Sequence, residues 1–433
     1  MTCLVPDAVI DTTGVHRGLA VLIDAESGLI EAVIGAEHAP ASALRLHGTA
    51  LLPGFVNAHS HSFQRDLRGI VERVSPEAPA DDFWTWRDAM YAAAGRLDPE
   101  RFGDVARRCF TQMRNAGFTT VGEFHYVHHQ PDGTPYPRPN ALAEAVCAAA
   151  EEVGIRIVLL LAAYERGGQD LAPTPGQRRF SDRSVDAFLE RLLALQEWAR
   201  PRPLVTVGAA PHSVRAVSAS WFERIAAHCA DHDLVLHVHA DEQPREIAEC
   251  HAEHGLRPVQ LLERTGALGA ATTIVHGTHC DDAEIALLAA AGSTVCVCPT
   301  TEANLGDGYG PIERLFDAGV PMAVGSDSNT IIDPLVELRE LEHIARRTAV
   351  RRNVLVRAGD RGPAPFLLDC GWSAGSRALG LAAPLIETDA PADLIAIDLM
   401  DDEIAGTADE HLAAAVALAG SSALVTRTWV AGR

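Results

Sequence analysis

The sequence predicts a TIM barrel, a closed (β/α)8 sheet ringed by helices, with a small β-sandwich-like domain attached. Apolar runs of strand length recur between about residues 50 and 330: 51–58, 119–126, 154–162, 204–211, 234–240, 272–278, 294–299 and 321–326. These runs lack the polar–apolar alternation of a half-exposed strand, so both faces of each strand should be buried, as in a parallel sheet.

The segments between the runs also fit a barrel. Most of the connections contain amphipathic stretches of helical length, at 98–116, 182–200, 218–232 and 281–291. Glycines such as Gly154 and Gly292 follow these stretches one or two residues before the next strand, where a left-handed helix cap is expected. Segments after strands are longer (62–97, 127–140 and 164–181), as a barrel with a working C-terminal face requires. A doubly wound open sheet is the alternative, but no glycine-rich phosphate loop follows the first run.

Both ends of the chain depart from this pattern. They contain short β-like pieces, at 18–24, 392–398 and 425–430. We expect these pieces to pair into one small β domain built from both termini. The predicted division is therefore 1–50 and 380–433 for the small domain, and 51–379 for the metal-dependent barrel.

The composition excludes several classes of partner. The net charge is −22, which argues against nucleic acid or an anionic membrane as the partner. All 36 basic residues are arginine, so no chemistry that needs a lysine is available. The nine cysteines are scattered and odd in number, which indicates reduced thiols. No signal peptide or membrane-spanning run is evident, so we expect a cytoplasmic protein.

Histidines gather at the C-terminal ends of the predicted strands. His59 and His61 lie two residues apart at the end of the first run, so they share one face of a strand. The later runs end with further candidates: His125, His212, His237, His239, His276, His279 and Asp327. On a closed barrel these ends meet over one mouth.

Imidazoles with one carboxylate suit zinc and leave an open position for water. Such an ion lowers the pKa of the bound water to about 7. Glu242, three residues after His239, can reach the same mouth without being a ligand. A carboxylate there is placed to carry a proton from water to a leaving nitrogen.

Several segments resemble a known family. P-G-F-V-N-A-H-S-H at 53–61 with G-S-D at 325–327 resembles the amidohydrolase superfamily. More specific segments resemble its formimidoylglutamate deiminases of histidine breakdown: 59–65 with Gly69, F-W-T-W-R at 83–87, E-F-H-Y-V-H-H at 123–129, Q-R-R-F at 177–180, P-H-S-V-R at 211–215 and C-P-T-T-E-A-N-L-G-D-G at 298–308. The resemblance covers nearly the whole chain.

The resemblance implies a role for each matching residue. The zinc-ligand positions are occupied by His59, His61, His239 and Asp327. Proton transfer and the positioning of the attacking water fall to Glu242 and His276, together with Asp327. The positions that line the substrate are occupied by Gln64, Arg87, Tyr126, His212 and Arg215. We expect one Zn²⁺ per chain, since two-metal relatives commonly use a carboxylated lysine as a bridge and this chain has no lysine.

The implied reaction is hydrolysis of N-formimino-L-glutamate to N-formyl-L-glutamate and ammonia, in a homodimer that binds a small acidic substrate. One alternative is a deaminase of nucleobases or of other amidine or guanidino acids, whose pocket would have little use for Arg87 and Arg215. Another is an inactive metal-binding relative, which should have lost Glu242 or a ligand. On the sequence alone, Arg87 follows two tryptophans on a long loop, where it faces the substrate, stacks on an aromatic ring or pairs with Asp82. The roles of six residues stay open: His125, His128, His129, His237, Asp241 and His279.

Overall fold

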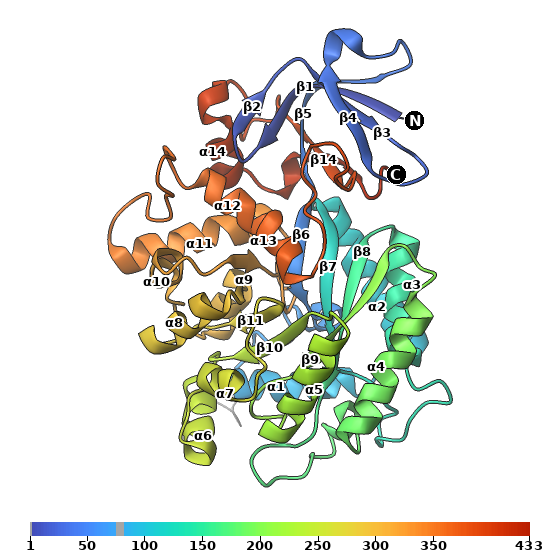
Figure 1. Ribbon diagram of the computed structural model, residues 1–433, viewed down its shortest axis with the longest axis vertical. Helices are drawn as coiled ribbons and strands as arrows, with labels where there is room; N and C mark the ends of the chain where they lie inside the picture. Colours follow the sequence, from blue (N-terminus) through green and yellow to red (C-terminus); the bar gives the residue numbers. More distant parts are fainter. Residues whose placement is uncertain (1, 75–81) are drawn as a thin grey trace.

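The computed structural model describes residues 2–74 and 82–433, and in it eight parallel strands form the predicted barrel (Figure 1). The strands are β6 (Phe55–Ser60), β7 (Phe118–His125), β8 (Arg156–Ala163), β9 (Val205–Pro211), β10 (Leu236–Ala240), β11 (Thr272–His276), β12 (Thr294–Val297) and β13 (Met322–Val324). They pair in chain order from β6 to β13. A parallel bridge between Ser60 and Asp327 joins the two outer strands at their C-terminal ends, so the barrel closes at its mouth.

The prediction of one strand over 51–58 is wrong in its boundaries. Two strands share this run, because β5 (Leu44–Pro53) belongs to the small sheet and β6 begins at Phe55. Between them, Gly54 passes so close to Thr119 that an added Cβ would lie 2.2 Å from that side chain. Since both strands bury their apolar residues, hydrophobicity alone does not separate them.

The α-helices of the described residues lie between the barrel strands or after β13. They are α1 (Phe83–Ala94), α2 (Pro99–Asn115), α3 (Ala141–Val153), α4 (Val185–Ala199), α5 (Ala219–Asp231), α6 (Pro244–His254), α7 (Pro258–Arg264), α8 (Asp282–Ala291), α9 (Pro299–Leu305), α10 (Ile312–Asp317), α11 (Pro334–Ala349), α12 (Ala364–Gly371), α13 (Ser373–Ala378) and α14 (Asp409–Ala419). The four predicted helical stretches are confirmed as α2, α4, α5 and α8. Among the described residues, no helix has both the length and the apolar composition that crossing a membrane requires.

The expectation that Arg87 lies on a loop is wrong. Arg87 lies on α1, at the end of the barrel opposite the small sheet (Figure 1). Asp82 does not pair with Arg87; its side chain accepts hydrogen bonds from the backbone N–H groups of Trp84 and Thr85 and so caps the helix. A capping box of this kind stabilises the first turn of a helix that lacks strong apolar periodicity.

The small domain is one mixed sheet made from both ends of the chain, as predicted. Its strands are β1 (Thr2–Asp11), β2 (Gly14–His16), β3 (Leu19–Ile23), β4 (Ile30–Gly35), β5 (Leu44–Pro53), β14 (Leu394–Asp398) and β15 (Val425–Trp429). The C-terminal strand β14 pairs antiparallel with β5, and β5 pairs parallel with β1. The two ends of the chain accordingly lie near each other in Figure 1.

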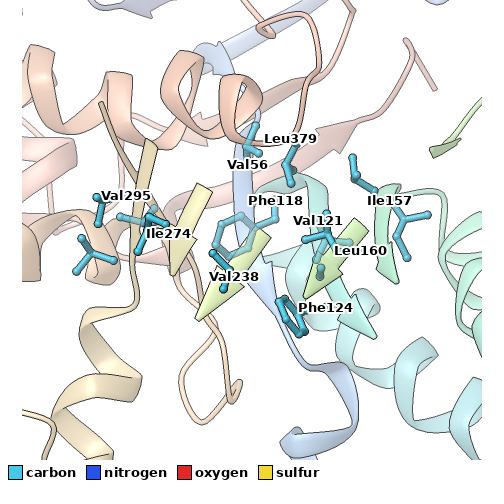
Figure 2. Close-up of a cluster of buried hydrophobic side chains, with 14 of the residues drawn as sticks. Val56, Phe118, Val121, Phe124, Ile157, Leu160, Val238, Ile274, Val295 and Leu379 are labelled. Atoms are coloured by element: carbon cyan, nitrogen blue, oxygen red, sulfur yellow. The ribbon is translucent and has the colours of Figure 1, made fainter. Parts of the chain in front are cut away.

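A continuous apolar core joins the barrel strands to the surrounding helices. Figure 2 shows members of this core on several strands, among them Val56 on β6, Val121 and Phe124 on β7, and Ile274 on β11. The ring of Phe124 extends the core to the C-terminal end of the barrel, where its centroid lies 4.4 Å from that of the His239 ring. The site described next therefore rests on packed apolar side chains.

Candidate active site

Three buried imidazoles converge at the mouth of the barrel. His59 and His61 lie near the end of β6, and His239 lies on β10. The Nε2 atom of His59 is 3.2 Å from the Nε2 atoms of both His61 and His239. This spacing brings the three ring nitrogens within 4.8 Å of one another, which suits ligation of one small cation.

Backbone carbonyls orient two of these rings. The Nδ1 atom of His61 donates to the carbonyl of Phe124 at 2.9 Å, and Nδ1 of His239 donates to the carbonyl of His212 at 3.0 Å. Because a carbonyl can only accept, each proton must lie on Nδ1, which leaves the Nε2 lone pair directed toward the centre. Burial lowers the pKa of His59 to about 3, which favours the neutral imidazole that a metal requires.

A carboxylate completes the group. Oδ1 of Asp327 lies 3.4 Å from Nε2 of both His59 and His61. Burial alone would raise the pKa of Asp327, but the neighbouring histidines outweigh it and hold the pKa well below its usual range. Three neutral imidazoles and one ionised carboxylate form a donor set that fits zinc or a similar divalent ion.

The backbone at Asp327 adopts a left-handed conformation, with φ at 43°. Its N–H donates to the carbonyl of His59, and its own carbonyl accepts from His61 N–H. Gly325 permits this close approach, since an added Cβ would lie 2.7 Å from the His59 carbonyl oxygen. Strained backbone of this kind is often found at functional sites.

Glu242 and His276 lie beside the histidine cluster. Nε2 of His276 is 3.6 Å from Oε1 of Glu242 and 3.8 Å from Oδ2 of Asp327. Burial alone would lower the pKa of His276, but the surrounding carboxylates outweigh it and raise the pKa well above its ordinary value. Burial raises the pKa of Glu242, against the opposing charges of His276 and Arg215. A carboxyl group with a raised pKa is suited to carrying a proton at neutral pH.

Sequence reasoning assigned no role to Glu302, which orients His276. Oε1 of Glu302 lies 3.2 Å from Nδ1 of His276 and accepts a hydrogen bond from the Cys298 N–H at 2.9 Å. Glu302 belongs to the segment 298–308, which resembles the deiminases, but the resemblance did not indicate where the Glu302 side chain points. A buried carboxylate behind an imidazole fixes the orientation of the ring.

A cavity of about 420 Å³ opens in front of the cluster. Its lining includes all five residues expected to face the substrate: Gln64, Arg87, Tyr126, His212 and Arg215. The Arg215 side chain is 13% exposed, with Nη2 lying 3.6 Å from Oε2 of Glu242. Gln64 donates through Nε2 to the Tyr126 hydroxyl at 2.8 Å, while its buried Oε1 has no partner within the described part of the chain.

The six residues that the sequence left open do not line this cavity. Nε2 of His237 donates to the carbonyl of Ala378 at 2.7 Å, so His237 does not compete with His239. Asp241 has a left-handed backbone, with φ at 56°, and its side chain pairs instead with Arg257 at 3.3 Å. His125, His128 and His129 are buried away from the cavity, and His279 is half-buried outside it.

Known proteins resemble this chain over most of its length. The model of the amidohydrolase family matches residues 50–433. Formimidoylglutamate deiminase of Pseudomonas aeruginosa is 37% identical over 391 residues, covering 89% of this chain and 84% of the relative. The 8-oxoguanine deaminase of the same organism is 28% identical, covering 79% of this chain and 74% of the relative.

Solved structures agree. An amidohydrolase from Brucella melitensis superposes with a TM-score of 0.91 at 32% identity, covering 100% of this chain and 94% of that one. An adenosine deaminase from Xanthomonas campestris with bound zinc has a TM-score of 0.83 at 26% identity, covering 100% of this chain and 92% of that one. The chain therefore belongs to the amidohydrolase family and is a hydrolase that acts on carbon–nitrogen bonds.

Proposed function

We propose that this protein hydrolyses N-formimino-L-glutamate to N-formyl-L-glutamate and ammonia. The observation that carries the proposal is the position of Arg215, which lines the same cavity as Glu242 and the histidine cluster. A guanidinium there can hold a substrate carboxylate while the formimino carbon lies at the cluster. The 37% identity to the Pseudomonas aeruginosa deiminase supports the same substrate.

The charge distribution favours an anionic substrate. The chain carries a net charge of −22, so an anion can bind only where arginines are concentrated locally. Both Arg87 and Arg215 line the cavity, and the Nε atom of each has no hydrogen-bond partner among the residues described. Two carboxylates flank Arg215, with Oε2 of Glu242 3.6 Å from its Nη2 and Oε1 of Glu246 3.8 Å from its Nε, and both distances exceed an ordinary hydrogen bond. Donors in both side chains are thus left for a substrate carboxylate.

In the proposed reaction, the residues around the cavity bring water and the formimino carbon together. A divalent ion held by His59, His61, His239 and Asp327 would polarise the attacking water and lower its pKa. Glu242 takes a proton from the water as the new C–O bond forms, and delivers it to the nitrogen that leaves. The hydroxyl group now on the carbon gives its remaining proton to Glu242 as the C=O bond forms. Glu242 passes this second proton to the same nitrogen as the C–N bond breaks, which releases ammonia and leaves the formyl group. His276, which lies between Glu242 and Asp327, stabilises the oxygen atom of the attacking water.

A nucleobase deaminase is the alternative, and it needs an aromatic face for stacking. Trp84 lies in the cavity, but its ring is already covered by cations. The guanidinium carbons of Arg87 and Arg245 lie 4.6 Å and 4.4 Å from its centroid. Arg215 makes a third such contact, with its guanidinium carbon 5.5 Å from the same centroid, and a ring engaged in three cation–π contacts is a poor platform for a base. This observation favours a linear acid as the substrate.

Ammonia release from a panel of substrates tests the proposal. We expect the highest kcat/KM with N-formimino-L-glutamate, a lower value with N-formimino-L-aspartate, and little or no turnover of guanine or 8-oxoguanine. The difference should arise because only the linear acids present carboxylates to the arginines. Faster turnover of a purine than of either formimino acid would reject the proposed substrate.

The Arg215→Met variant should bind substrate less well and otherwise remain intact. Loss of one charge-assisted hydrogen bond is expected to lower kcat/KM by about 10- to 150-fold. Metal content and melting temperature should stay close to those of the wild type. The matched control is Arg224→Met, which removes an exposed arginine paired with Asp186 and should leave kcat/KM unchanged.

The decisive comparison for Arg215 uses a formimino amine that lacks the carboxylate held by this arginine. The wild type should process it poorly, and Arg215→Met should do hardly worse, since the contact is already missing. Equal losses on the full and truncated substrates would show that Arg215 supports the structure instead.

A further inference from the structure

A hydrogen-bonded cluster of Tyr91, Tyr164 and Gln177 lines the cavity, and the proposed reaction does not use it. Tyr91 lies on α1, Tyr164 directly follows β8, and Gln177 precedes the 3₁₀ helix Arg178–Phe180. Gln177 belongs to the Q-R-R-F segment, for which the sequence offered no specific role. Three separate parts of the chain thus bring polar groups to one wall.

The hydrogen bonds of Gln177 fix which way its amide faces. Oε1 accepts from both the backbone N–H and the hydroxyl of Thr174, each at 2.9 Å. The amide nitrogen therefore faces the tyrosines, and donates to the hydroxyls of Tyr91 at 3.2 Å and Tyr164 at 2.8 Å. Because an amide NH₂ group can only donate, both phenolic oxygens act as acceptors.

This arrangement leaves a hydroxyl proton without an acceptor. The two phenols carry two protons, and the Tyr91 hydroxyl adds to the burial that raises the pKa of Tyr164 well above its ordinary value. If one tyrosine donates its hydroxyl proton to the hydroxyl oxygen of the other, the hydroxyl proton of the second tyrosine still has no acceptor among the side chains described. Tyr126 differs, because its hydroxyl accepts from Gln64 and contacts the sulfur of Met90 at 3.2 Å. Tyr91 and Tyr164 thus present a donor to the cavity.

The rest of the Q-R-R-F segment holds the cluster in place. The buried guanidinium of Arg179 donates to the carbonyls of Leu97 and His129, each at 2.9 Å, and also to that of Ala94 at the end of α1. The fully buried ring of Phe180 lies 5.6 Å from that of Tyr91 and 5.8 Å from that of Tyr164. Donors held this firmly lose little conformational entropy when they bind a ligand.

The ring of His212 separates this cluster from the three histidines that converge at the mouth of the barrel. The Tyr164 ring is 5.0 Å from that of His212, which is itself 5.0 Å from that of His239. The charge of Arg215 is close enough to influence the pKa of Tyr164. A linear substrate with its reacting carbon at the histidines would place its far end between Arg215 and the two phenols.

We propose that Tyr91 and Tyr164, oriented by Gln177, hydrogen-bond the substrate carboxylate farthest from the reacting carbon. This inference rests on the proposed function, and it assigns the selection of side-chain length to these phenols. In N-formimino-L-glutamate two methylene groups separate the distal carboxylate from the α-carbon. A neutral hydroxyl donor beside an arginine matches one carboxylate, whose two oxygens can accept from the phenols and from the guanidinium.

Two substrates test the proposal: N-formimino-L-glutamate, and N-formimino-L-norvaline, in which a methyl group replaces the distal carboxylate. The Tyr91→Phe/Tyr164→Phe double variant should lose about 10- to 100-fold in kcat/KM on the first substrate, mainly through KM. On the second substrate it should match the wild type. The control Tyr309→Phe, at an exposed tyrosine outside the cavity, should change neither value.

The Gln177→Glu variant provides a second test that keeps both phenols. Its carboxylate would accept the hydroxyl protons and turn them away from the cavity, so the same selective loss is expected. Equal losses on both substrates, or no loss on the glutamate derivative, would overturn the inference. A wild-type chain that releases no ammonia from N-formimino-L-glutamate would overturn the proposed function itself, and this inference with it.

Discussion

The Glu242→Gln variant is expected to lose about 10²- to 10⁴-fold in kcat on N-formimino-L-glutamate, because an amide cannot take up and deliver the proton. The substitution preserves the shape and most of the contacts of a side chain buried between His276 and Arg215. Glu242 is not one of the residues whose side-chain atoms converge on one point at His59, His61 and His239, so the metal content should stay at the wild-type level. Ammonia release, elemental analysis and the melting temperature measure the three quantities.

The control for this variant is Glu263→Gln, which makes the same change at an exposed position on α7 and should leave all three quantities unchanged. A Glu242→Gln variant with near-normal kcat would show that another group moves the proton. A variant that lost its metal as well would place Glu242 among the ligands.

The His239→Ala variant should lose both the metal and the activity. The wild type is expected to bind about one divalent ion per chain, and removal of one of four ligands should leave the ion weakly held. His237→Ala is a matched control, since this histidine lies on the same strand but donates to the carbonyl of Ala378. It should lose thermal stability and keep its ion.

Elemental analysis of protein purified without added metal gives the stoichiometry. Two equivalents per chain, both needed for activity, would contradict a single-ion site. Retention of a full equivalent by His239→Ala would remove that histidine from the ligand set.

Much of the barrel was predictable because parallel strands and their glycine-capped helices repeat a simple pattern. Strand ends meet at one mouth in a closed barrel, so His59, His239 and Asp327 were grouped before any coordinates were known. The boundary at Gly54 was not predictable in this way, because β5 and β6 are both buried and apolar. Helix α1 was missed because its stability comes from the cap at Asp82 and from packing, with little apolar periodicity.

The directions of individual side chains were the least predictable part of the site. Asp241 and Glu242 are adjacent acidic residues; the sequence assigned Glu242 to the mouth of the barrel but left the direction of Asp241 open. The left-handed backbone at Asp241 decides this, and it depends on contacts with Arg257 from a distant segment. Tyr91, Tyr164 and Gln177 were likewise brought together only by tertiary structure.

The pairing of β14 with β5 has a consequence for the order in which the chain folds. β5 leads through Gly54 directly into β6, the strand that carries His59 and His61. Its antiparallel neighbour β14 begins only at Leu394, so this edge of β5 stays without its partner while all eight barrel strands are synthesised. Closing such a long loop is slow, and an exposed strand edge favours aggregation in the meantime. Nascent chains of this enzyme should therefore depend on chaperones until the segment from Leu394 onward has left the ribosome.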